Sequence, residues 1–491
     1  MIILVGSKID QASIQGALGK PEYSYYFLMK DFLPVLERLG RVQLVKSTAE
    51  IEALYKQHHA AGEEVVFLSF SPPHQAPLGL SCPTIVVFAW EFDSLPSVAW
   101  EGNPQNDWRY AFAHLRGGIS TSREAAGLVE SAMPPGYPVI ALPAPVWDRY
   151  RSGKAATQTY PQLGERQFPF SGVVIDSPML GLSADGLVRK PGEAPPAVVA
   201  APTQFWQLSK ALFKGWLREI RLPMEPALSI TPAKQASTPA VAPPTAVNDP
   251  APAAEPPLHL IDVSGVVYTT VLNPADSRKN WVELITAFCW AFKDSDDATL
   301  IVKMTHHDLG HYRIVLMTLL SRLAPFNCRV LVLHGFLEDE QYRQLIEASS
   351  YYVNASSGEG LCLPLMEFLS AGKPVIAPTH TAMADYVNER LAFLVKCSLE
   401  PFCWPHDPTG IFMTHRHRLN WESLVEAYQH SYRVAKDEPE RYREMAEQAD
   451  ARMQAFASID RVAGPLGAFL GQIASAQSAQ VDVGFAGGAM L

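Results

Sequence analysis

The sequence has few cysteines, no long apolar run and no excess of basic residues. Six cysteines among 491 residues are too few for a disulfide scaffold, and their scatter over apolar segments is typical of buried, reduced thiols. No stretch of about 18 apolar residues occurs, so we expect no membrane-spanning helix. The 40 basic and 50 acidic residues give a net charge of −10, which argues against a protein that binds nucleic acid through bulk positive charge.

The first ten residues, MIILVGSKID, contain a short apolar run. No basic stretch precedes this run and no small-residue cleavage site follows it. We therefore expect a buried first strand rather than a signal peptide, and a cytoplasmic protein.

The first 150 residues alternate strand-like and helix-like segments. The segments 65–70 and 84–90 are continuous apolar runs, which suit parallel strands that are buried on both faces. Apolar residues make up 48% of the chain, enough for real cores. The pattern predicts an N-terminal domain at 1–150 with a doubly wound parallel sheet, of the Rossmann-like α/β class.

Residues 151–257 interrupt this alternation. Ten prolines lie between positions 223 and 257, a composition typical of an extended linker. One segment of this insertion, 203–221, has helical periodicity, with basic residues on one face and Phe and Trp on another. Such a helix either lies in a membrane interface or docks on one of the domains, and both interpretations remain open.

A second alternating pattern begins at residue 258 and predicts another doubly wound domain at 258–455. Its strand-like segments are 266–271, 298–304, 329–334, 351–355, 374–377 and 391–395. The remainder, 456–491, predicts a further helix, with a split expected near Gly464-Pro465, followed by a flexible Gly-rich tail.

The segment from Asn354 to Tyr386 carries the most chemical information. A strand ends near Asn354, a small and flexible loop follows at 356–360, and a helix begins near Pro364. A glycine-bearing loop that leads from a parallel strand into a helix N-terminus favours an anion site, because free N–H groups and the helix dipole meet there. Two carboxylates, Glu359 and Glu367, accompany this loop eight residues apart.

This E-x7-E spacing lies within GLCLPLMEFLSAGKPVIA and is followed by Asp385. The segment resembles the retaining GT-B glycosyltransferases of family 4. The resemblance extends upstream to the Ser277–Trp281 segment and to Gly335, and it covers about residues 258–470. It implies two Rossmann-like domains with a cleft between them, and a terminal helix near 460–473 that crosses back onto the first domain.

The resemblance also implies roles for particular residues. Glu367 is expected to accept hydrogen bonds from a ribose, Glu359 to contact a sugar hydroxyl, and Lys279 to pair with a diphosphate. The backbone N–H groups of Gly360, Leu361 and Cys362 are expected to approach the sugar and diphosphate, with Gly335 also in the nucleotide site. A fixed positive potential suits a polyanionic leaving group, so no protein nucleophile is expected.

Three positions depart from the family pattern. Many relatives have an Arg six positions before the diphosphate Lys, where this chain has Asn273; the neighbouring Arg278 either compensates or is a surface charge. Many relatives also place a His after a strand of the first domain. Here Glu91 follows the matching strand, and His74 follows the previous one. Both are candidate catalytic residues, because open α/β sheets bind ligands at the carboxyl ends of their strands.

Several clusters suggest a metal, but each has a more ordinary interpretation. Asp308, within His306-His307-Asp308 and before His311, is typical of a helix cap. Asp294-Ser295-Asp296 spells the DxD of metal-dependent transferases with another fold, but it lies between a helix and a strand and predicts a turn. The cysteine and histidine spacing near 397–406 matches no firm ligand pattern. We therefore expect no metal and no required cofactor.

The resulting hypothesis is a glycosyltransferase that moves a sugar from a UDP- or GDP-sugar donor to a hydroxyl of a carbohydrate or lipid-linked glycan acceptor. The expected setting is bacterial surface polysaccharide or glycolipid synthesis. The protein would be cytoplasmic or peripheral on the inner face of the plasma membrane, in contact through 203–221. Two alternatives stay open, a GT-B sugar-nucleotide epimerase and a non-catalytic scaffold that keeps the fold.

Overall fold

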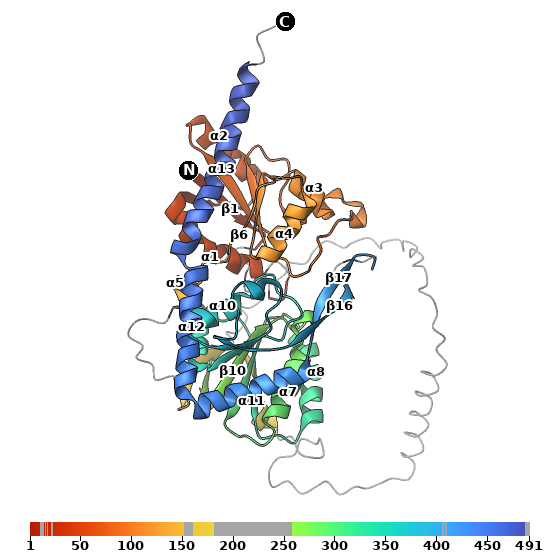
Figure 1. Ribbon diagram of the computed structural model, residues 1–491, viewed down its shortest axis with the longest axis vertical. Coiled ribbons are helices and arrows are strands. Elements are labelled where there is room, and N and C mark those ends of the chain that lie inside the picture. The colour runs from red at the N-terminus through yellow and green to blue at the C-terminus, as the bar shows by residue number, and fades with distance from the viewer. Residues whose placement is uncertain are drawn as a thin grey trace, which may run out of the picture. The chain divides into compact units, whose positions relative to one another are not determined.

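A computed structural model describes residues 1–9, 14, 16, 18–20, 23–151, 161–180, 258–404, 407 and 410–486. The predicted helix at 203–221 and the Pro-rich linker lie outside these residues. The described part of the chain contains two parallel β-sheets flanked by helices, one in each half of the sequence (Figure 1).

The N-terminal sheet has six strands, and all of its neighbouring strands pair in parallel. The strands in spatial order are β2 (Arg41–Leu44), β1 (Ile2–Ser7), β3 (Val65–Phe70), β4 (Thr84–Phe88), β5 (Gly117–Ser120) and β6 (Val139–Ala141). Every residue of β3 and β4 is buried, as their continuous apolar runs predict for strands covered on both faces.

Helices connect these strands and cover the sheet. They are α1 (Tyr23–Leu39), α2 (Thr48–Ala60), α3 (Trp108–Ala113), α4 (Arg123–Ala132) and α5 (Trp147–Tyr150). Ser47 caps α2 and Ser122 caps α4, each by accepting a hydrogen bond from a backbone N–H of the first turn. These caps fix where the helices leave the strand ends, and α4 begins at the edge of the sheet where a ligand would bind.

The C-terminal sheet has seven strands. In spatial order they are β15 (Ala392–Leu394), β14 (Val375–Ala377), β13 (Tyr351–Val353), β10 (Val266–Leu272), β11 (Ala298–Met304), β12 (Arg329–His334) and β8 (Val173–Asp176). All neighbours pair in parallel except β8, which is antiparallel to β12 at the edge. The prediction of an α/β fold with two Rossmann-like parallel sheets is confirmed.

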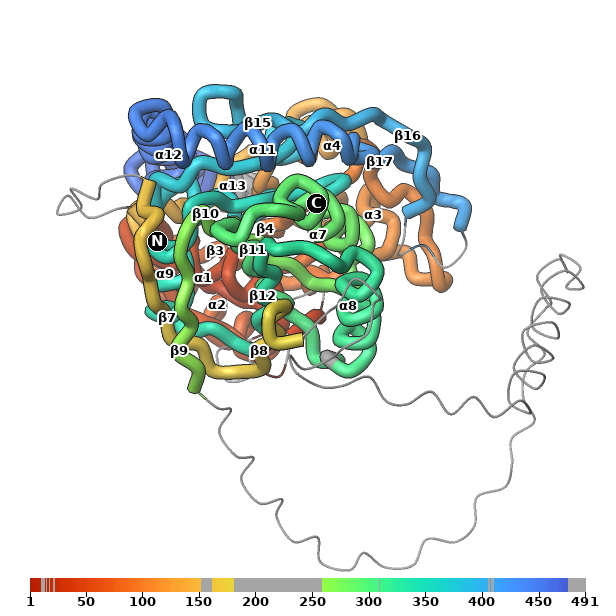
Figure 2. The backbone as a smooth tube through the Cα atoms, turned by 90° about the horizontal axis from the view of Figure 1, so that it is seen from below, coloured from red at the N-terminus to blue at the C-terminus, as the bar shows by residue number. Residues whose placement is uncertain are grey.

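Figure 2 shows helices on both sides of this second sheet, with α7 and α8 away from α9. The helices are α7 (Trp281–Ala291), α8 (Leu309–Leu323), α9 (Asp339–Ala348), α10 (Leu363–Ser370) and α11 (Trp421–Asp437). Asp308 caps α8 by accepting a hydrogen bond from His311 N–H, which confirms the cap interpretation of the histidine cluster. The Asp294–Asp296 segment lies between α7 and β11, as the turn interpretation requires.

The boundary between domain and insertion differs from the prediction. Strand β8 lies in the segment assigned to the 151–257 insertion, yet it completes the C-terminal sheet. Strand β7 (Arg166–Ser171) pairs antiparallel with β9 (Leu258–Val263) beside that sheet, and Phe168 and Phe170 are fully buried there. The sequence signal was missed because β7 and β8 are short and stand next to a long proline-rich stretch.

The last helices return to the N-terminal domain. After α12 (Pro439–Ala457), helix α13 (Ile459–Ala486) packs on α1 and β3, with Leu466 and Leu470 fully buried. The expected break at Gly464-Pro465 is wrong, because Pro465 lies inside α13. A proline inside a helix removes one backbone hydrogen bond, and burial of the surrounding apolar face offsets that loss.

A hairpin that the sequence did not reveal joins β16 (Cys397–Cys403) to β17 (Met413–Leu419). Its tip reaches the N-terminal domain, where Asp93 accepts hydrogen bonds from Thr414 Oγ1 at 3.0 Å and from the backbone N–H of His415 at 3.1 Å. At its other end, the backbone N–H of His417 donates to the carbonyl of Ser357 at 3.0 Å. The hairpin therefore ties the loop after β13 to the first domain.

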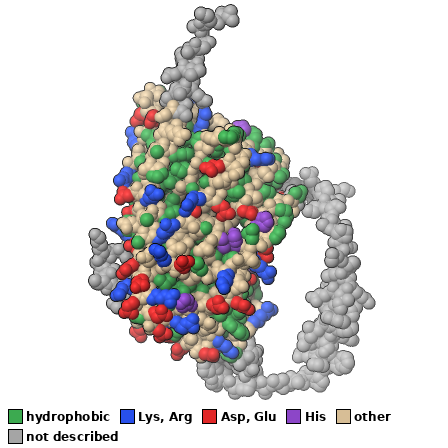
Figure 3. Space-filling view, in the orientation of Figure 1, with side chains coloured by type: hydrophobic (Ala, Val, Ile, Leu, Met, Phe, Trp, Pro, Cys, Tyr) green, Lys and Arg blue, Asp and Glu red, His purple; other side chains and the backbone are tan. Residues whose placement is uncertain are grey.

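The surface and the helices agree with two expectations from composition. On the face shown in Figure 3, acidic and basic side chains are interspersed, with no basic face of the kind that binds nucleic acid. Over the residues that the structure describes, no helix combines the length and the apolarity needed to span a bilayer.

The assignment of β7 to the C-terminal core can be tested by substitution. Phe168→Ala removes a fully buried ring and is expected to lower the free energy of unfolding by about 3–5 kcal/mol. Gln167→Ala, at an exposed position of the same strand, is the matched control. Chemical denaturation measures both variants, and equal stability of Phe168→Ala and the native chain would place β7 outside the core.

Candidate active site

The candidate site lies at the carboxyl ends of two neighbouring strands. Strand β10 leads into a short 3-10 turn, Ser277–Lys279, and β13 leads into the loop 354–362 that precedes α10. Because β10 and β13 are adjacent and parallel, their ends meet at one edge of the sheet. This arrangement brings the SRK segment against the E-x7-E loop, which the sequence places about 80 residues further on.

Glu359 is the acceptor at the centre of the contact. Lys279 Nζ lies 2.6 Å from Glu359 Oε1, and Arg278 Nη1 lies 3.1 Å from Glu359 Oε2. Asn354 Nδ2 donates to Glu359 Oε1 at 3.0 Å, and Arg278 Nη1 also donates to the carbonyl of Gly358 at 2.6 Å. Both carboxylate oxygens of a 3% exposed residue are thus fully engaged.

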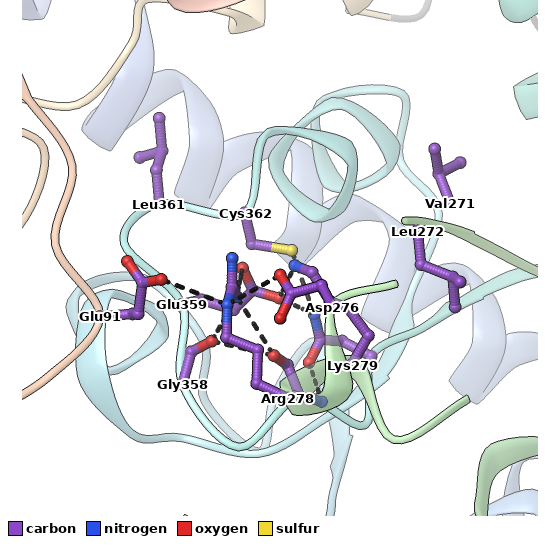
Figure 4. Close-up of polar contacts among 12 residues, drawn as sticks. Glu91, Val271, Leu272, Asp276, Arg278, Lys279, Gly358, Glu359, Leu361 and Cys362 are labelled. Atoms are coloured by element: carbon purple, nitrogen blue, oxygen red, sulfur yellow. Dashed lines mark hydrogen bonds and ion pairs between the residues drawn. The ribbon is translucent and has the colours of Figure 1, made fainter. Parts of the chain in front are cut away.

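Glu91 of the N-terminal domain joins the same guanidinium. Arg278 Nε lies 3.3 Å from Glu91 Oε1 and 3.0 Å from Asp276 Oδ2. Figure 4 shows Arg278 between Glu91 on one side and Asp276 with Lys279 on the other. Three carboxylates therefore surround two cations, and one arginine links side chains from both domains.

The charges of this cluster set its titration. Burial disfavours the Glu359 carboxylate, but the Lys279 and Arg278 charges, with hydrogen bonds from Lys279 and Asn354, outweigh it and lower the pKa of Glu359 to about 2. Burial raises the pKa of Glu91, and the Arg278 charge only partly opposes the rise. Glu359 is thus held as an anion, while Glu91 is the more readily protonated acid.

The loop 354–362 is buried along its whole length, which corrects the expectation of a flexible loop. A Cβ on Gly358 would lie 2.7 Å from the carbonyl of Glu91, and one on Gly360 would lie 2.8 Å from the backbone nitrogen of Trp90. Thr121 Oγ1 also donates to the carbonyl of Gly360. The small residues of the loop thus permit close packing against the strand end of the first domain.

The backbone N–H groups before α10 form a candidate anion site. Among the described residues, no hydrogen bond uses the N–H groups of Gly360, Leu361 or Cys362, although Leu361 and Cys362 are buried. Cys362 precedes α10 in the left-handed conformation, at φ 64°. Buried N–H groups normally have partners, so successive open ones at a helix N-terminus favour a bound anion.

A small pocket lies beside this cluster, at the ends of β10 and β13. Its lining residues are Thr270, Val271, Leu272, Lys279, Tyr352, Asn354, Ala355, Ser356 and Glu359. It combines a cation, an amide and a carboxylate with apolar walls, as small-molecule sites commonly do.

Glu367 lies in a second cluster. It sits on the second turn of α10, 6% exposed, where Tyr342 Oη donates to its Oε2 at 2.6 Å. Burial, with the nearby Asp31 charge, raises the pKa of Glu367, and the Tyr342 hydrogen bond and Arg149 oppose the rise. Arg149 bridges Asp31 and Asp339 at 2.8 and 2.7 Å, so this cluster also joins the two domains.

The structure gives the other predicted residues distinct surroundings. His74 stacks on Trp108 and accepts a hydrogen bond from its Nε1 at 3.1 Å, which places His74 in an aromatic cluster of the first domain rather than beside Glu359. Asn273 Nδ2 donates to the carbonyl of Gly19 at 3.1 Å and so links the two domains. A Cβ on Gly335 would lie 2.8 Å from the carbonyl of Ser171, so close packing alone requires a glycine there.

Three residues were missed or undervalued by sequence reasoning. Asn354, at the end of β13, fixes the Glu359 carboxylate, and Asp276 orients Arg278. Asp385 receives the Arg123 N–H at 2.9 Å and Arg123 Nε at 3.0 Å, at the start of α4. The position of Asn354 and Asp276 next to strand ends was the available signal.

No group of three or more His, Cys, Asp or Glu side chains arranged to hold a metal occurs within the described ranges. His415 Nδ1 lies 2.8 Å from Asp93 Oδ2, and His417 stacks on His380 with ring centroids 4.0 Å apart.

Residues 311–401 match the family model described as Glycosyl transferases group 1. This segment runs from α8 into β16 and includes both carboxylates of the E-x7-E loop. The two Rossmann-like sheets and this domain define the class of the protein, a glycosyltransferase with the GT-B fold. No curated protein sequence matches the chain significantly.

Three solved structures illustrate the similarity. HepE of Anabaena in complex with UDP and glucose is 12% identical with a TM-score of 0.48, over 98% of this chain and 100% of that chain. Sucrose-phosphate synthase of Thermosynechococcus elongatus is 13% identical with a TM-score of 0.48, over 97% and 100%. A glycosyltransferase of Rickettsia africae is 9% identical with a TM-score of 0.49, over 96% and 98%.

The raised pKa of Glu367 predicts a pH-dependent stability. Above the unfolded pKa of about 4.3, the folded state still holds a proton that the unfolded state has lost, so the contribution of Glu367 to stability falls as pH rises. Glu367→Gln does not titrate, and we expect its Tm relative to the native chain to increase between about pH 5 and about pH 8.

Glu340→Gln, at an exposed position of α9, is the control and is expected to show no such trend. A Tm difference for Glu367→Gln that stays constant over the pH range would contradict the assigned environment.

Proposed function

We propose that the protein transfers a sugar, with retention of configuration, from a UDP- or GDP-sugar to an acceptor hydroxyl. The observation that carries this proposal is the set of open N–H groups before α10 beside the Lys279–Glu359–Arg278 cluster. A helix N-terminus with adjacent cations binds phosphate oxygens, and Glu359 supplies a fixed acceptor for a sugar hydroxyl. This is the chemistry that a nucleoside diphosphate sugar presents.

The chemical step needs stabilisation of the leaving group more than it needs a nucleophile. When the bond between sugar and phosphate breaks, negative charge accumulates on the diphosphate, and preorganised N–H groups and Lys279 lower the barrier. In the structure Lys279 pairs with Glu359, so we infer that the diphosphate attracts Lys279 while Glu359 keeps the partners Arg278 and Asn354. The anionic state of Glu359 is retained throughout, because two further donors remain.

We propose Glu91 rather than His74 as the group of the N-terminal domain nearest the reacting atoms. Glu91 contacts Arg278 directly, and its raised pKa lets it take up or hold a proton near neutral pH. The acceptor would enter from this side, between the two domains. Glu367 would bind the ribose through its Oε1, since its Oε2 accepts from Tyr342.

We further propose a carbohydrate or lipid-linked glycan as the acceptor, in bacterial surface polysaccharide or glycolipid synthesis. This setting is supported by the family resemblance and by the cationic amphipathic pattern of 203–221, which lies outside the described residues. Contact of a cytoplasmic protein with the inner face of the plasma membrane would follow from that pattern.

The membrane contact can be tested by flotation. The full chain is expected to float with anionic liposomes, and the chain without residues 203–221 is expected to remain at the bottom of the gradient, because the basic and aromatic faces are lost together. Equal behaviour of the two chains would reject the membrane contact and leave the transfer reaction untouched.

The transfer reaction is tested by substitution of the cluster. Lys279→Ala and Glu359→Gln are each expected to lower the rate of sugar transfer by about 10²–10³-fold, because each removes a preorganised charge from the site. Lys293→Ala, at an exposed position after α7, is the matched control and should keep the native rate. The readouts are release of nucleoside diphosphate and the anomeric configuration of the product by NMR.

Full activity of both cluster variants would remove this site from the reaction. Inversion at the anomeric carbon would reject retention alone. Conversion of the donor to an epimer without an acceptor would favour the epimerase alternative, and native protein that binds no nucleotide would favour a scaffold.

A further inference from the structure

Lys303 is a buried cation that the reaction described above does not use. It lies at the carboxyl end of β11 and is 3% exposed. Its Nζ makes one hydrogen bond, a donation to the carbonyl of Met304 at 3.3 Å. A lysine ammonium has three donors, so two are unsatisfied, and no carboxylate forms an ion pair with Lys303 within the described residues.

Such a cation is costly to keep in a folded core. Its neighbours in register on the adjacent strands are Val271 and Leu333, both apolar. Burial lowers the pKa of Lys303 to about 7, with no acidic partner to oppose the shift. An apolar residue at this position would pack without that cost, which indicates that the charge has a partner absent from the free protein.

The position of Lys303 places that partner in the candidate site. Val271, its neighbour in register, lines the pocket together with Leu272, Lys279 and Glu359. Figure 4 shows Val271 and Leu272 at the end of β10, on the Lys279 side of the cluster. Lys303 therefore lies one strand away from the pocket, at the same edge of the sheet.

The charge balance of the site indicates what the partner is. Lys279 and Arg278 already face three carboxylates, Glu91, Asp276 and Glu359. A nucleoside diphosphate brings further negative charge into a site whose visible cations are neutralised. Lys303 is the nearby cation whose charge is still uncompensated, and Asn273 supplies none where many relatives have an Arg.

We propose that Lys303 binds the diphosphate of the donor, as a second cation beside Lys279. This assignment rests on the proposed function, because it takes the nucleoside diphosphate as the ligand. The ammonium would exchange its single long hydrogen bond for phosphate oxygens, which are stronger acceptors. Binding of the donor would thereby also relieve an unfavourable buried charge.

The experiment measures nucleotide binding by calorimetry with Lys303→Met, Lys303→Gln and the native chain. UDP and GDP are the nucleotides, pyrophosphate and uridine or guanosine are the partial ligands. Both variants are expected to bind the accepted nucleoside diphosphate and pyrophosphate at least about tenfold more weakly, or about 1.4 kcal/mol. The affinity for the nucleoside should remain unchanged, and the Tm of Lys303→Met should equal or exceed that of the native chain.

Lys373→Met is the matched control. Lys373 is also 3% exposed with a pKa lowered to about 7 by burial, but it precedes β14 at the opposite edge of the sheet and donates to the carbonyl of Glu347. Its substitution should leave nucleotide affinity at the native value. An equal loss of affinity in the Lys373 and Lys303 variants would mean that the effect comes from the core and would overturn the proposal.

The remaining outcomes separate this proposal from the proposed function. Native binding of UDP or GDP with unchanged affinity in both Lys303 variants would overturn the role of Lys303 and leave the donor site in place. A loss for uridine or guanosine equal to that for the diphosphate would also overturn it, because the contact would then be to the nucleoside. A native chain that binds neither nucleotide nor pyrophosphate would reject both proposals.

Discussion

The guanidinium of Arg278 is the contact on which the geometry of the site depends. It binds Glu359 and the carbonyl of Gly358 in the second domain and Glu91 in the first. A planar group with five donors can hold several acceptors in fixed directions, which a lysine at the same position could not do. Because one side chain orients both acids, movement of one domain against the other would change the surroundings of Glu359 and Glu91 together.

The strands, the E-x7-E loop and the Lys279 segment were predictable from sequence, because each depends on local patterns. Continuous apolar runs gave β3, β11 and β12 with their observed bounds, and glycine and proline marked the ends of α10. Glu359 and Lys279 were found through a spacing that resembles a family, and the structure brings the two side chains into contact.

The remaining features depend on contacts between distant segments. The burial of the loop 354–362 comes from the backbone of the first domain at Trp90 and Glu91, which no local pattern reports. The separation of Glu367 from Glu359 follows from the direction of α10, and the partners of Glu367 come from α1, α5 and α9. Lys303 escaped notice because a lysine at a strand end normally points to solvent, and only packing shows that it does not.

The two pieces of chain that build the second domain have a practical consequence for dividing the protein. A recombinant fragment that starts at residue 258 would contain the donor-side residues but would lack β7 and β8, so the backbone edges of β9 and β12 would be left bare. Bare edges recruit strands from other molecules and promote aggregation. A usable fragment would have to graft residues 161–180 onto its front, which makes this domain a discontinuous one whose outermost ribbon is translated long before the rest of its sheet.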